Sequence, residues 1–373
     1  METGLASVFR QSGVPFEVKE LPLPDVEPDA ILIRITMANI CGSDLHVWRG
    51  EIKPAVGPEG YVAGHEGAGQ VARLGHNIKT DSLGRPLKEG DRVVFTYFFP
   101  CGRCYACLDD RPNACPTRSS RFGPRSAAIP PYFTGTFAQY YYLRPGHYVF
   151  KAPDELSDEL LAPVNCALCQ VIEGLQQAGF RFGDTVVLQG AGGLGLYAAA
   201  VAKDMGAGLV ISVDRLALRL ELAKKFGADA VINAAEYSKP EDRIAKVMEL
   251  TDGVGAHVAM DLVGVPAVIP EGLEMLRQGG TYVEIGGIWP AKIELDPSKL
   301  VSGNRRIIAM SHYHPRVLPQ ALSFLLRNKT RFPFDQMLSH KFPLQKVNEA
   351  FETAEWARTS GDPTKVIRAS LVP

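Results

Sequence analysis

The stretch Thr185-Val-Val-Leu-Gln-Gly-Ala-Gly-Gly-Leu-Gly195 joins a short apolar run to a glycine-rich turn. The apolar run predicts a buried strand, and the small residues after the last glycine predict a helix that packs close to the sheet. The glycines form the pattern G-x-G-x-x-G, in which the backbone approaches a pyrophosphate at the start of a helix. The sequence therefore predicts a dinucleotide site with contacts from Gly190, Gly192, Gly193, Leu194 and Gly195.

An acidic residue in the expected place supports this interpretation. Asp214 ends the next predicted strand, nineteen residues after Gly195. A carboxylate there accepts hydrogen bonds from both ribose hydroxyls and repels a 2′-phosphate, which favours NAD over NADP. Arg215 follows directly and keeps NADP open. A glycine-rich turn in an α/β protein that binds no nucleotide is the alternative interpretation.

Strands and helices alternate around this motif. The patterns predict helices over 194–205 and 216–226, and strands over 209–214, 230–233, 257–261 and 281–286. Such alternation is typical of βαβ units on a parallel sheet. We therefore expect an α/β protein with a Rossmann-type coenzyme domain over 161–305, entered through a helical segment at 158–175.

The first 160 residues differ from this pattern. Runs at 30–37 and 91–99 predict strands, and frequent glycines predict turns, so that residues 1–160 are expected to form an irregular β-barrel with functional loops. Residues 306–373 mix helix and strand and are expected to return to this domain through a last strand at 365–372. Polar segments at 77–89 and 118–134 are expected to be loops, and the second could line a substrate entrance.

The composition excludes several functions. The chain has 373 residues, 46% of them hydrophobic and 22% charged, with a formal net charge of −1. This balance gives no sign of a nucleic-acid or anionic-membrane partner. No apolar run approaches the roughly 20 residues of a membrane span, and the N-terminus does not resemble a signal peptide. We expect a soluble cytoplasmic protein with reduced cysteines.

Four cysteines lie within fifteen residues, with the spacing Cys-x2-Cys-x2-Cys-x7-Cys. Four thiolates at short range are what a closed tetrahedral zinc site requires. A disulfide inside the run is the alternative, but nothing in the sequence indicates an oxidising compartment. We predict a structural zinc held by Cys101, Cys104, Cys107 and Cys115.

Three further donors are spread along the chain. Cys41 follows the first predicted strand, His65 lies between glycines, and Cys166 begins the helical segment before the coenzyme domain. Two cysteines and a histidine form a set that leaves one zinc position open. Singly, a buried cysteine or histidine is more often part of a core, so their joint occurrence carries the prediction.

Five motifs in order resemble the zinc-dependent medium-chain alcohol dehydrogenases over nearly the whole chain. They are Cys-Gly-Ser-Asp-Leu-His at 41–46, Gly-His-Glu at 64–66, the four-cysteine loop at 101–115, Ala-Pro-x-x-Cys-Ala at 162–167 and the glycine motif at 190–195. The resemblance implies a GroES-like catalytic domain, two zinc ions per chain and NAD. It also implies reversible oxidation of an alcohol to an aldehyde or ketone. A homodimer or homotetramer is expected, with the strand in 280–288 pairing across the dimer.

The resemblance also assigns roles at the metal. It implies that Cys41, His65 and Cys166 hold the catalytic zinc. It implies that Ser43 and His46 pass a proton from the bound alcohol to solvent by way of the nicotinamide ribose. A hydroxyl both accepts and donates, and histidine titrates near neutrality, as such a relay requires.

Four further residues are assigned in the same way. Asp44 would orient His65, and Glu66 would lie beside the metal. Arg219 would help to bind the adenosine ribose, and Arg368 the pyrophosphate. Each arginine could equally be an ordinary surface residue.

The chain departs from the family pattern in small ways. Gln170 stands where many relatives have threonine, and Gly135-Thr136 replaces a glycine pair. Cys169 lies one turn from Cys166 and is expected to pack in the core, although an exchange of the two as ligand stays open. None of these departures removes a required group.

The substrate is less well defined. Trp48, Tyr97 and Phe133 are candidate pocket walls, with 285–288 expected near the nicotinamide. Walls of this kind favour an apolar, cyclic or aromatic alcohol, with a polyol as the alternative. A zinc-free quinone or enoyl reductase and a non-catalytic dinucleotide-binding protein with a structural zinc are the competing functions.

Overall fold

The computed structural model describes residues 2–54, 57–118, 126–288, 290–359 and 368–373. By its contacts the chain forms two compact units. Unit 1 consists of Met1–Cys166, His314–Lys329 and Phe334–Pro373, and unit 2 of Ala167–Tyr313 and Thr330–Pro333.

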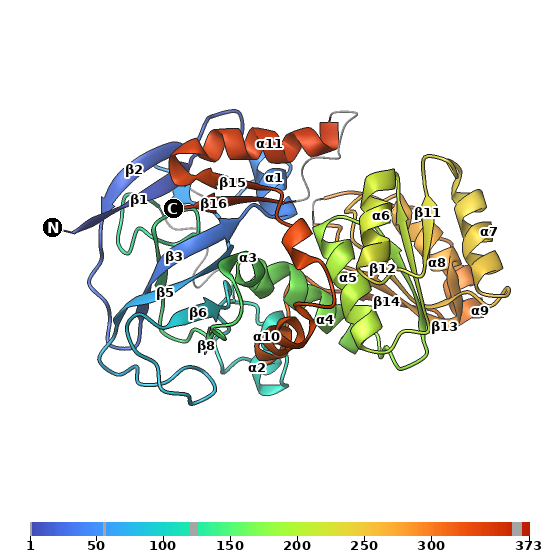
Figure 1. The fold of residues 1–373 in the computed structure, drawn as a ribbon, viewed down its shortest axis with the longest axis horizontal. Helices are drawn as coiled ribbons and strands as arrows, with labels where there is room; N and C mark the ends of the chain where they lie inside the picture. The colour runs from blue at the N-terminus through green and yellow to red at the C-terminus, as the bar shows by residue number, and fades with distance from the viewer. Residues whose placement is uncertain (1, 55–56, 119–125, 289, 360–367) are drawn as a thin grey trace. The chain divides into compact units, whose positions relative to one another are not determined.

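Unit 2 is built on a six-stranded parallel sheet in the order β11-β10-β9-β12-β13-β14 (Figure 1). The strands are β9 (Thr185–Gln189), β10 (Leu209–Asp214), β11 (Ala230–Asn233), β12 (Ala256–Asp261), β13 (Leu276–Glu284) and β14 (Arg306–Ala309). The strand order reverses between β9 and β12. In such sheets the ligand crevice lies outside the carboxyl ends of the strands at that reversal.

Helices cover both faces of this sheet. They are α4 (Cys169–Gln177), α5 (Gly193–Asp204), α6 (Ala217–Lys225), α7 (Pro240–Leu250), α8 (Val268–Glu274) and α9 (Pro297–Gly303). Val187, Ala259 and Tyr282 of the sheet share one core cluster with Ile269 and Leu273 of α8. The alternation of strand and helix confirms the predicted Rossmann-type parallel sheet.

Unit 1 contains two antiparallel assemblies (Figure 1). The smaller has the order β2-β1-β4, and the larger runs β15-β16-β3-β5-β6-β8 with β7 also paired to β3. The strands are β1 (Thr3–Phe9), β2 (Glu17–Pro22), β3 (Ile31–Asn39), β4 (Tyr61–Val62), β5 (Glu66–Leu74), β6 (Arg92–Phe95), β7 (Tyr140–Leu143), β8 (Val149–Lys151), β15 (His340–Pro343) and β16 (Ala369–Val372). The only parallel pair among them is β15 with β16.

Helices of different lengths also belong to unit 1. They are α1 (Gly42–Trp48), α2 (Tyr105–Leu108), α3 (Asp158–Leu161), α10 (Val317–Asn328) and α11 (Val347–Thr359). Figure 1 shows α11 beside β15 and β16, and Phe351 of α11 belongs to the main core cluster of unit 1.

The segment predicted as one helix over 158–175 is interrupted. Helix α3 ends at Leu161, and Val164–Leu168 forms a turn of π-helix before α4 begins at Cys169. Pro163 has no N–H to continue the first helix, which explains the break. Such turns are frequent at functional sites, and this one contains Cys166.

Several expected boundaries differ from the structure. Unit 2 begins at Ala167 instead of residue 161, and it also includes Thr330–Pro333. Unit 2 extends to Tyr313 instead of residue 305, because β14 pairs with β13 as the sixth strand of the parallel sheet. Strand β13 is therefore interior, and β14 forms the sheet edge. The last strand begins at Ala369, and residues 365–367 of the strand expected over 365–372 lie outside the described residues. Among the described residues, no helix is long and apolar enough to cross a membrane.

Candidate functional site

A buried set of four donors lies within unit 1. Cys41, His65, Glu66 and Cys166 each offer one ligand atom, and all four atoms lie within 4.8 Å of one another. Cys41 is the N-cap of α1, His65 directly precedes β5, and Cys166 lies in the π-helical turn. The antiparallel pairing of β3 with β5 places Asn39 opposite Glu66, which brings the first two donors together.

Asp44 ties two of these donors to the start of α1. The backbone N–H of Cys41 donates to Asp44 Oδ2 at 2.9 Å. His65 Nδ1 lies 3.3 Å from Asp44 Oδ1. With Nδ1 held by a carboxylate, Nε2 is the nitrogen that faces the other donors, as is common for metal-binding histidines. Ser43 Oγ lies 3.5 Å from this Nε2.

The donors of the set change the pKa values of one another. A hydrogen bond from Cys166 is the largest cause that lowers the pKa of the Cys41 thiol well below its usual value, and His65 acts in the same direction. Burial disfavours a charged His65, yet Asp44 and Cys41 together raise its pKa well above the usual value. Thiolate and carboxylate groups held close together are the ligands that a divalent cation neutralises.

Glu66 forms a buried ion pair behind the donors. Its Oε2 accepts from Arg368 Nη1 at 2.5 Å, while its buried Oε1 has no hydrogen-bond partner within the part of the chain that the structure describes. Burial raises the pKa of Glu66 to about 8, although Arg368 opposes the shift. Arg368 is only 7% exposed and forms an ion pair with Glu66. The residue expected to bind pyrophosphate therefore lies beside the donor set.

His46 lies on α1 three residues beyond Ser43, which places both side chains on one face of the helix. His46 Nδ1 lies 2.5 Å from Glu51 Oε2, and Arg49 donates to the same Glu51 oxygen at 2.9 Å. Arg49 also donates to Glu355 of α11 at 2.7 Å. Sequence reasoning missed Glu51 and Arg49, although both follow His46 within five residues.

The four-cysteine loop forms a second donor set. The Sγ atoms of Cys101, Cys104, Cys107 and Cys115 lie within 4.8 Å of one another, and all four are free thiols. Burial raises the pKa of Cys115, but hydrogen bonds from Thr117 and from the Cys101 N–H lower it to about 6. The arrangement fits a zinc ion and contains no disulfide, which was the alternative.

The glycine turn of unit 2 lies where the sequence predicts it. Gly190 follows β9 with φ +111°, and a Cβ on Gly195 would lie 1.9 Å from the Gly190 carbonyl oxygen. Gly192 is the N-cap of α5, so Gly193 and Leu194 begin the helix. Close backbone packing of this kind exposes N–H groups at a helix start, where a phosphate binds.

Asp214 and Arg219 border this turn. The N–H of Ala191 donates to Asp214 Oδ2 at 2.8 Å, and Leu216 N–H donates to Oδ1 at 3.0 Å. Arg219 Nη1 lies 4.0 Å from Asp214 Oδ2, and Arg215 is exposed. The acidic residue at the end of β10 is thus fixed against the glycine turn.

Of the other candidate residues, one lies beside the donor set and the others pack in the core. The Tyr97 ring lies 4.9 Å from that of His65, beside the donor set. Trp48 packs on Phe351 at 6.0 Å, and Phe133 is fully buried in a separate core cluster. Cys169 is also fully buried and stands outside the donor set, so the structure favours Cys166 as the ligand.

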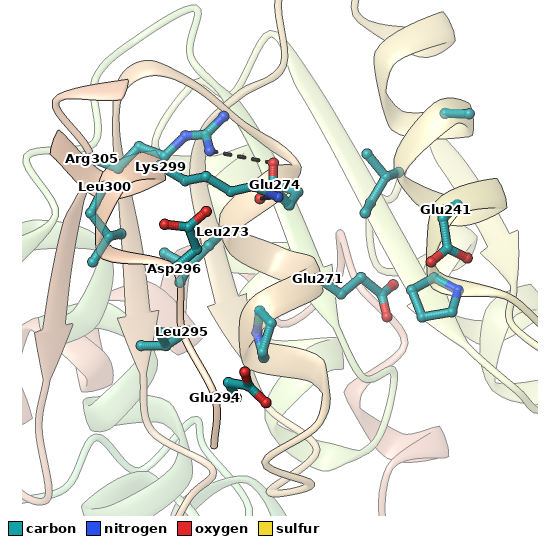
Figure 2. A pocket seen from close by; sticks show the side chains of 14 residues that line it. Glu241, Glu271, Leu273, Glu274, Glu294, Leu295, Asp296, Lys299, Leu300 and Arg305 are labelled. Carbon is teal, nitrogen blue, oxygen red and sulfur yellow. Dashed lines mark ion pairs between the residues drawn. The ribbon is translucent and has the colours of Figure 1, made fainter. Parts of the chain in front are cut away.

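A hollow of about 580 Å³ lies elsewhere on unit 2, between α7, α8 and α9 (Figure 2). Two of its acidic side chains are in ion pairs: Glu271 pairs with Arg243, and Glu274 pairs with Lys299 and Arg305. None of the predicted site residues lines it.

Comparison with known families agrees with this geometry. Residues 27–154 match the alcohol dehydrogenase GroES-like domain, and residues 193–327 match the zinc-binding dehydrogenase domain. The chain is 33% identical to the 5-exo-hydroxycamphor dehydrogenase of Pseudomonas putida over 341 residues, covering 90% of this chain and 91% of the relative. The chain belongs to the zinc-dependent medium-chain alcohol dehydrogenase family.

Other members of the family extend the comparison. The sorbitol dehydrogenase of Bacillus subtilis is 32% identical and covers 91% of this chain and 90% of its own length. The crystal structure of an alcohol dehydrogenase from Thermotoga maritima has a TM-score of 0.89 at 28% identity, with both chains fully covered. Benzyl alcohol dehydrogenase from Acinetobacter calcoaceticus gives 0.83 at 25%, covering 100% of this chain and 99% of its own. The GroES-like domain and the parallel-sheet unit are thus both shared with this family.

Proposed function

We propose that the protein is an NAD- and zinc-dependent alcohol dehydrogenase that oxidises an alcohol reversibly to an aldehyde or ketone. The observation that carries this proposal is the buried donor set of Cys41, His65 and Cys166 with Ser43 beside it. When bound, zinc supplies a Lewis acid that lowers the pKa of an alcohol, and NAD supplies the hydride acceptor.

Two zinc ions fit the side chains present. Two cysteines and one histidine leave a position for substrate, and the orphaned Glu66 Oε1 provides a nearby fourth donor. The four-cysteine loop would hold the second ion, with a purely structural role. A binding protein with one structural zinc has no use for the first set, which argues against that alternative.

Ser43 and His46 would move the proton that leaves the alcohol. Ser43 Oγ lies beside the donor set and can accept and donate at once. His46 lies on the same face of α1, and Glu51 fixes the ring through Nδ1. If Nδ1 carries the hydrogen of that bond, Nε2 bears no hydrogen in this tautomer and can accept a proton.

NAD is proposed over NADP because of Asp214. Its carboxylate lies at the end of β10 against the glycine turn, where it would repel a 2′-phosphate. Arg219 borders the same turn and would contact the adenosine ribose. Arg368 is paired with Glu66 in this structure. For Arg368 to contact the pyrophosphate, as proposed, this ion pair would have to rearrange.

The proposed substrate is an apolar cyclic or aromatic alcohol. The Tyr97 ring beside His65 supports this, as does similarity to a hydroxycamphor dehydrogenase. A polyol is the second candidate, supported by similarity to a sorbitol dehydrogenase. We also propose that the protein forms a homo-oligomer in which the edge strand β14 pairs with the same strand of a second chain. The strand in 280–288 was expected to pair in this way, but β13 is interior to the sheet.

The decisive experiment combines metal analysis with an activity panel. We expect two zinc ions per chain, NAD preferred over NADP, and cyclic or benzylic alcohols oxidised faster than sorbitol. One zinc per chain with no turnover would support a structural site alone, and no zinc would support a zinc-free reductase. Sorbitol far ahead of the other alcohols would reject the proposed substrate class but keep the enzyme class.

A further inference from the structure

Two carboxyl groups meet at the carboxyl ends of adjacent strands in unit 2. Asp261 is the last residue of β12 and Glu284 the last of β13, and the two are paired in register. Registered neighbours in a parallel sheet point to the same face. Asp261 is fully buried and Glu284 is half-buried, and one carboxyl oxygen of each side chain is itself buried.

Each carboxyl group has one satisfied oxygen and one orphaned oxygen. Asp261 Oδ1 accepts from the N–H groups of Val263 at 2.8 Å and Gly264 at 3.1 Å, and Glu284 Oε1 accepts from Gly287 N–H at 2.6 Å. Asp261 Oδ2 and Glu284 Oε2 are buried with no donor among the described residues. The register pairing of β12 with β13 places the two carboxyl groups side by side at the ends of their strands. One proton between the orphaned oxygens would satisfy both.

Among the described residues of the neighbouring elements, no cationic side chain is paired with Asp261 or Glu284. Gln189 of β9 stands in register with Asp261, but its amide is bonded to Tyr282 and to the Val268 carbonyl. Glu271 of α8 is paired with Arg243 of α7. Arg306 of β14 donates to Thr281 Oγ1.

The electrostatics agree with the geometry. Burial raises the pKa of Asp261 above its usual value. Burial and then the charge of Asp261 raise the pKa of Glu284 to about 7. Two carboxylates in contact cannot both ionise at little cost, because their charges repel in a poorly solvated site.

The pair holds the loops that border the glycine turn. Strands β9 and β12 flank the point where the strand order reverses, so the residues after Asp261 lie at the expected crevice. A Cβ on Gly190 would lie 2.9 Å from Val263 Cγ2. A Cβ on Gly264 would lie 2.6 Å from the Gly286 carbonyl oxygen, which shows that the two loops touch.

We propose that Asp261 and Glu284 share one proton and position the loops 262–264 and 285–287 against the glycine turn, so that loss of this proton weakens dinucleotide binding. The binding part of this inference rests on the proposed NAD site. Removal of the proton leaves two adjacent carboxylates whose repulsion separates the loops at the Gly264–Gly286 contact. The two residues are positioning residues, since they act on the cofactor through these loops.

The test compares Glu284→Gln with the wild type over a pH series. The glutamine amide donates to Asp261 Oδ2 at every pH and so imitates the protonated pair. Fluorescence titration would measure the Kd for NADH. In the wild type we expect this Kd to rise about tenfold between pH 6 and pH 9, because one hydrogen bond is lost and repulsion is added. In Glu284→Gln the Kd should not change with pH. Glu284→Ala, which cannot bridge, should bind weakly at both pH values. Glu294→Gln is the control, because it removes the same charge from an exposed position.

Infrared difference spectroscopy tests the proton itself without cofactor. The wild type should show a protonated-carboxyl band that disappears as the pH rises through about 7, and Glu284→Gln should lack it. Persistence of the band in Glu284→Gln, or identical pH profiles for wild type and variant, would overturn the proposal. If neither protein binds NADH at any pH while the band behaves as expected, the shared proton stands, and both the NAD site and the proposed link to binding are rejected.

Thermal unfolding gives a third readout. The native pKa of Glu284 is raised from 4.5, so the native state keeps a proton that the unfolded chain has lost. Stability from this group is therefore present at low pH and is lost as the pH rises through about 7. Glu284→Gln should melt higher than the wild type at pH 8.5, with the difference shrinking towards pH 5. A constant difference would contradict the shared proton.

Discussion

The four-cysteine loop and the donor set around Cys166 offer similar ligands, but the chain assembles them in different ways. The loop collects four thiols within fifteen residues, and three of them are only half-buried. The other set draws on donors from position 41 to position 166, and all of them except the half-buried His65 are buried. Local spacing therefore suffices to build the loop, whereas the second set requires the folded sheet.

The surroundings of the two sets differ as well. The loop is supported by backbone N–H groups and Thr117. The dispersed set is supported by charged groups, with Asp44 on His65 and Arg368 on Glu66. Charged partners beside a metal ligand orient it and change its reactivity. The comparison predicts that damage to the dispersed set removes activity and damage to the loop removes stability.

The largest effect is expected for Cys166→Ala. Loss of a ligand should lower kcat/KM for alcohol oxidation by about 1,000-fold or more, because the metal site supplies most of the transition-state stabilisation. Circular dichroism should show an unchanged fold, and metal analysis one zinc per chain. The matched control is Cys169→Ala, which removes a buried thiol outside the set. Full turnover in Cys166→Ala would reject the ligand assignment and remove the contrast between the two sets.

Cys107→Ser should act on stability instead. A broken tetrathiolate site should lower the melting temperature by about 5–10 °C, because metal binding contributes directly to folding. Protein that remains folded should keep most of its turnover per catalytic zinc. A variant that melts like the wild type but is inactive would mean that the loop serves catalysis, contrary to the comparison.

Glu51→Gln should produce an intermediate effect on the dispersed site. A hydrogen bond from Arg49, with support from His46, lowers the pKa of Glu51 to about 2, so its carboxylate is ionised near neutrality. Loss of this partner should lower kcat by about tenfold at every pH between roughly 6 and 9, since orienting partners of this kind are worth 10–100-fold. Stopped-flow hydride transfer provides the measurement. Exposed Glu59→Gln is the control, and a decrease confined to KM would argue against a role in proton transfer.

The lowered pKa of Glu51 also fixes the sign of its effect on stability. Its contribution is present above the unfolded value of 4.5 and is lost as the pH falls towards 2. The difference in melting temperature between wild type and Glu51→Gln should therefore narrow in acid. A gap that widens below pH 4 would show that Glu51 is not held by these cationic partners.

The smallest effect is expected for Tyr97→Ala. Removal of the ring beside His65 should change the ratio of kcat/KM between benzylic and polyol substrates by about five- to tenfold, since a lost apolar wall costs roughly 1–3 kcal/mol. Trp48→Phe is the control, because Trp48 packs on Phe351 in the core. An equal change in the control would show that packing, rather than the pocket, sets the preference.

Much of the fold and of the candidate site could be predicted from the sequence because it depends on local sequence patterns. The strand, glycine turn and helix around Gly190 were expected within a residue or two, since periodicity and turn chemistry act over short distances. The break at Pro163 and the sixth strand β14 were missed. The first could have been predicted from Pro163, which cannot continue a helix. The second was missed because β14 is mostly exposed and so carries no buried apolar run.

The sequence by itself determined the parallel sheet, the two donor sets by residue type and the acidic residue at Asp214. Only the tertiary structure decided which side chains meet. It placed Arg368 on Glu66 from 302 positions away, Glu51 on His46, and Asp261 beside Glu284 on neighbouring strands. The reason is physical: ligand spacing and helix periods are set along the chain, whereas charge pairing and burial depend on distances that exist only after the sheets have formed.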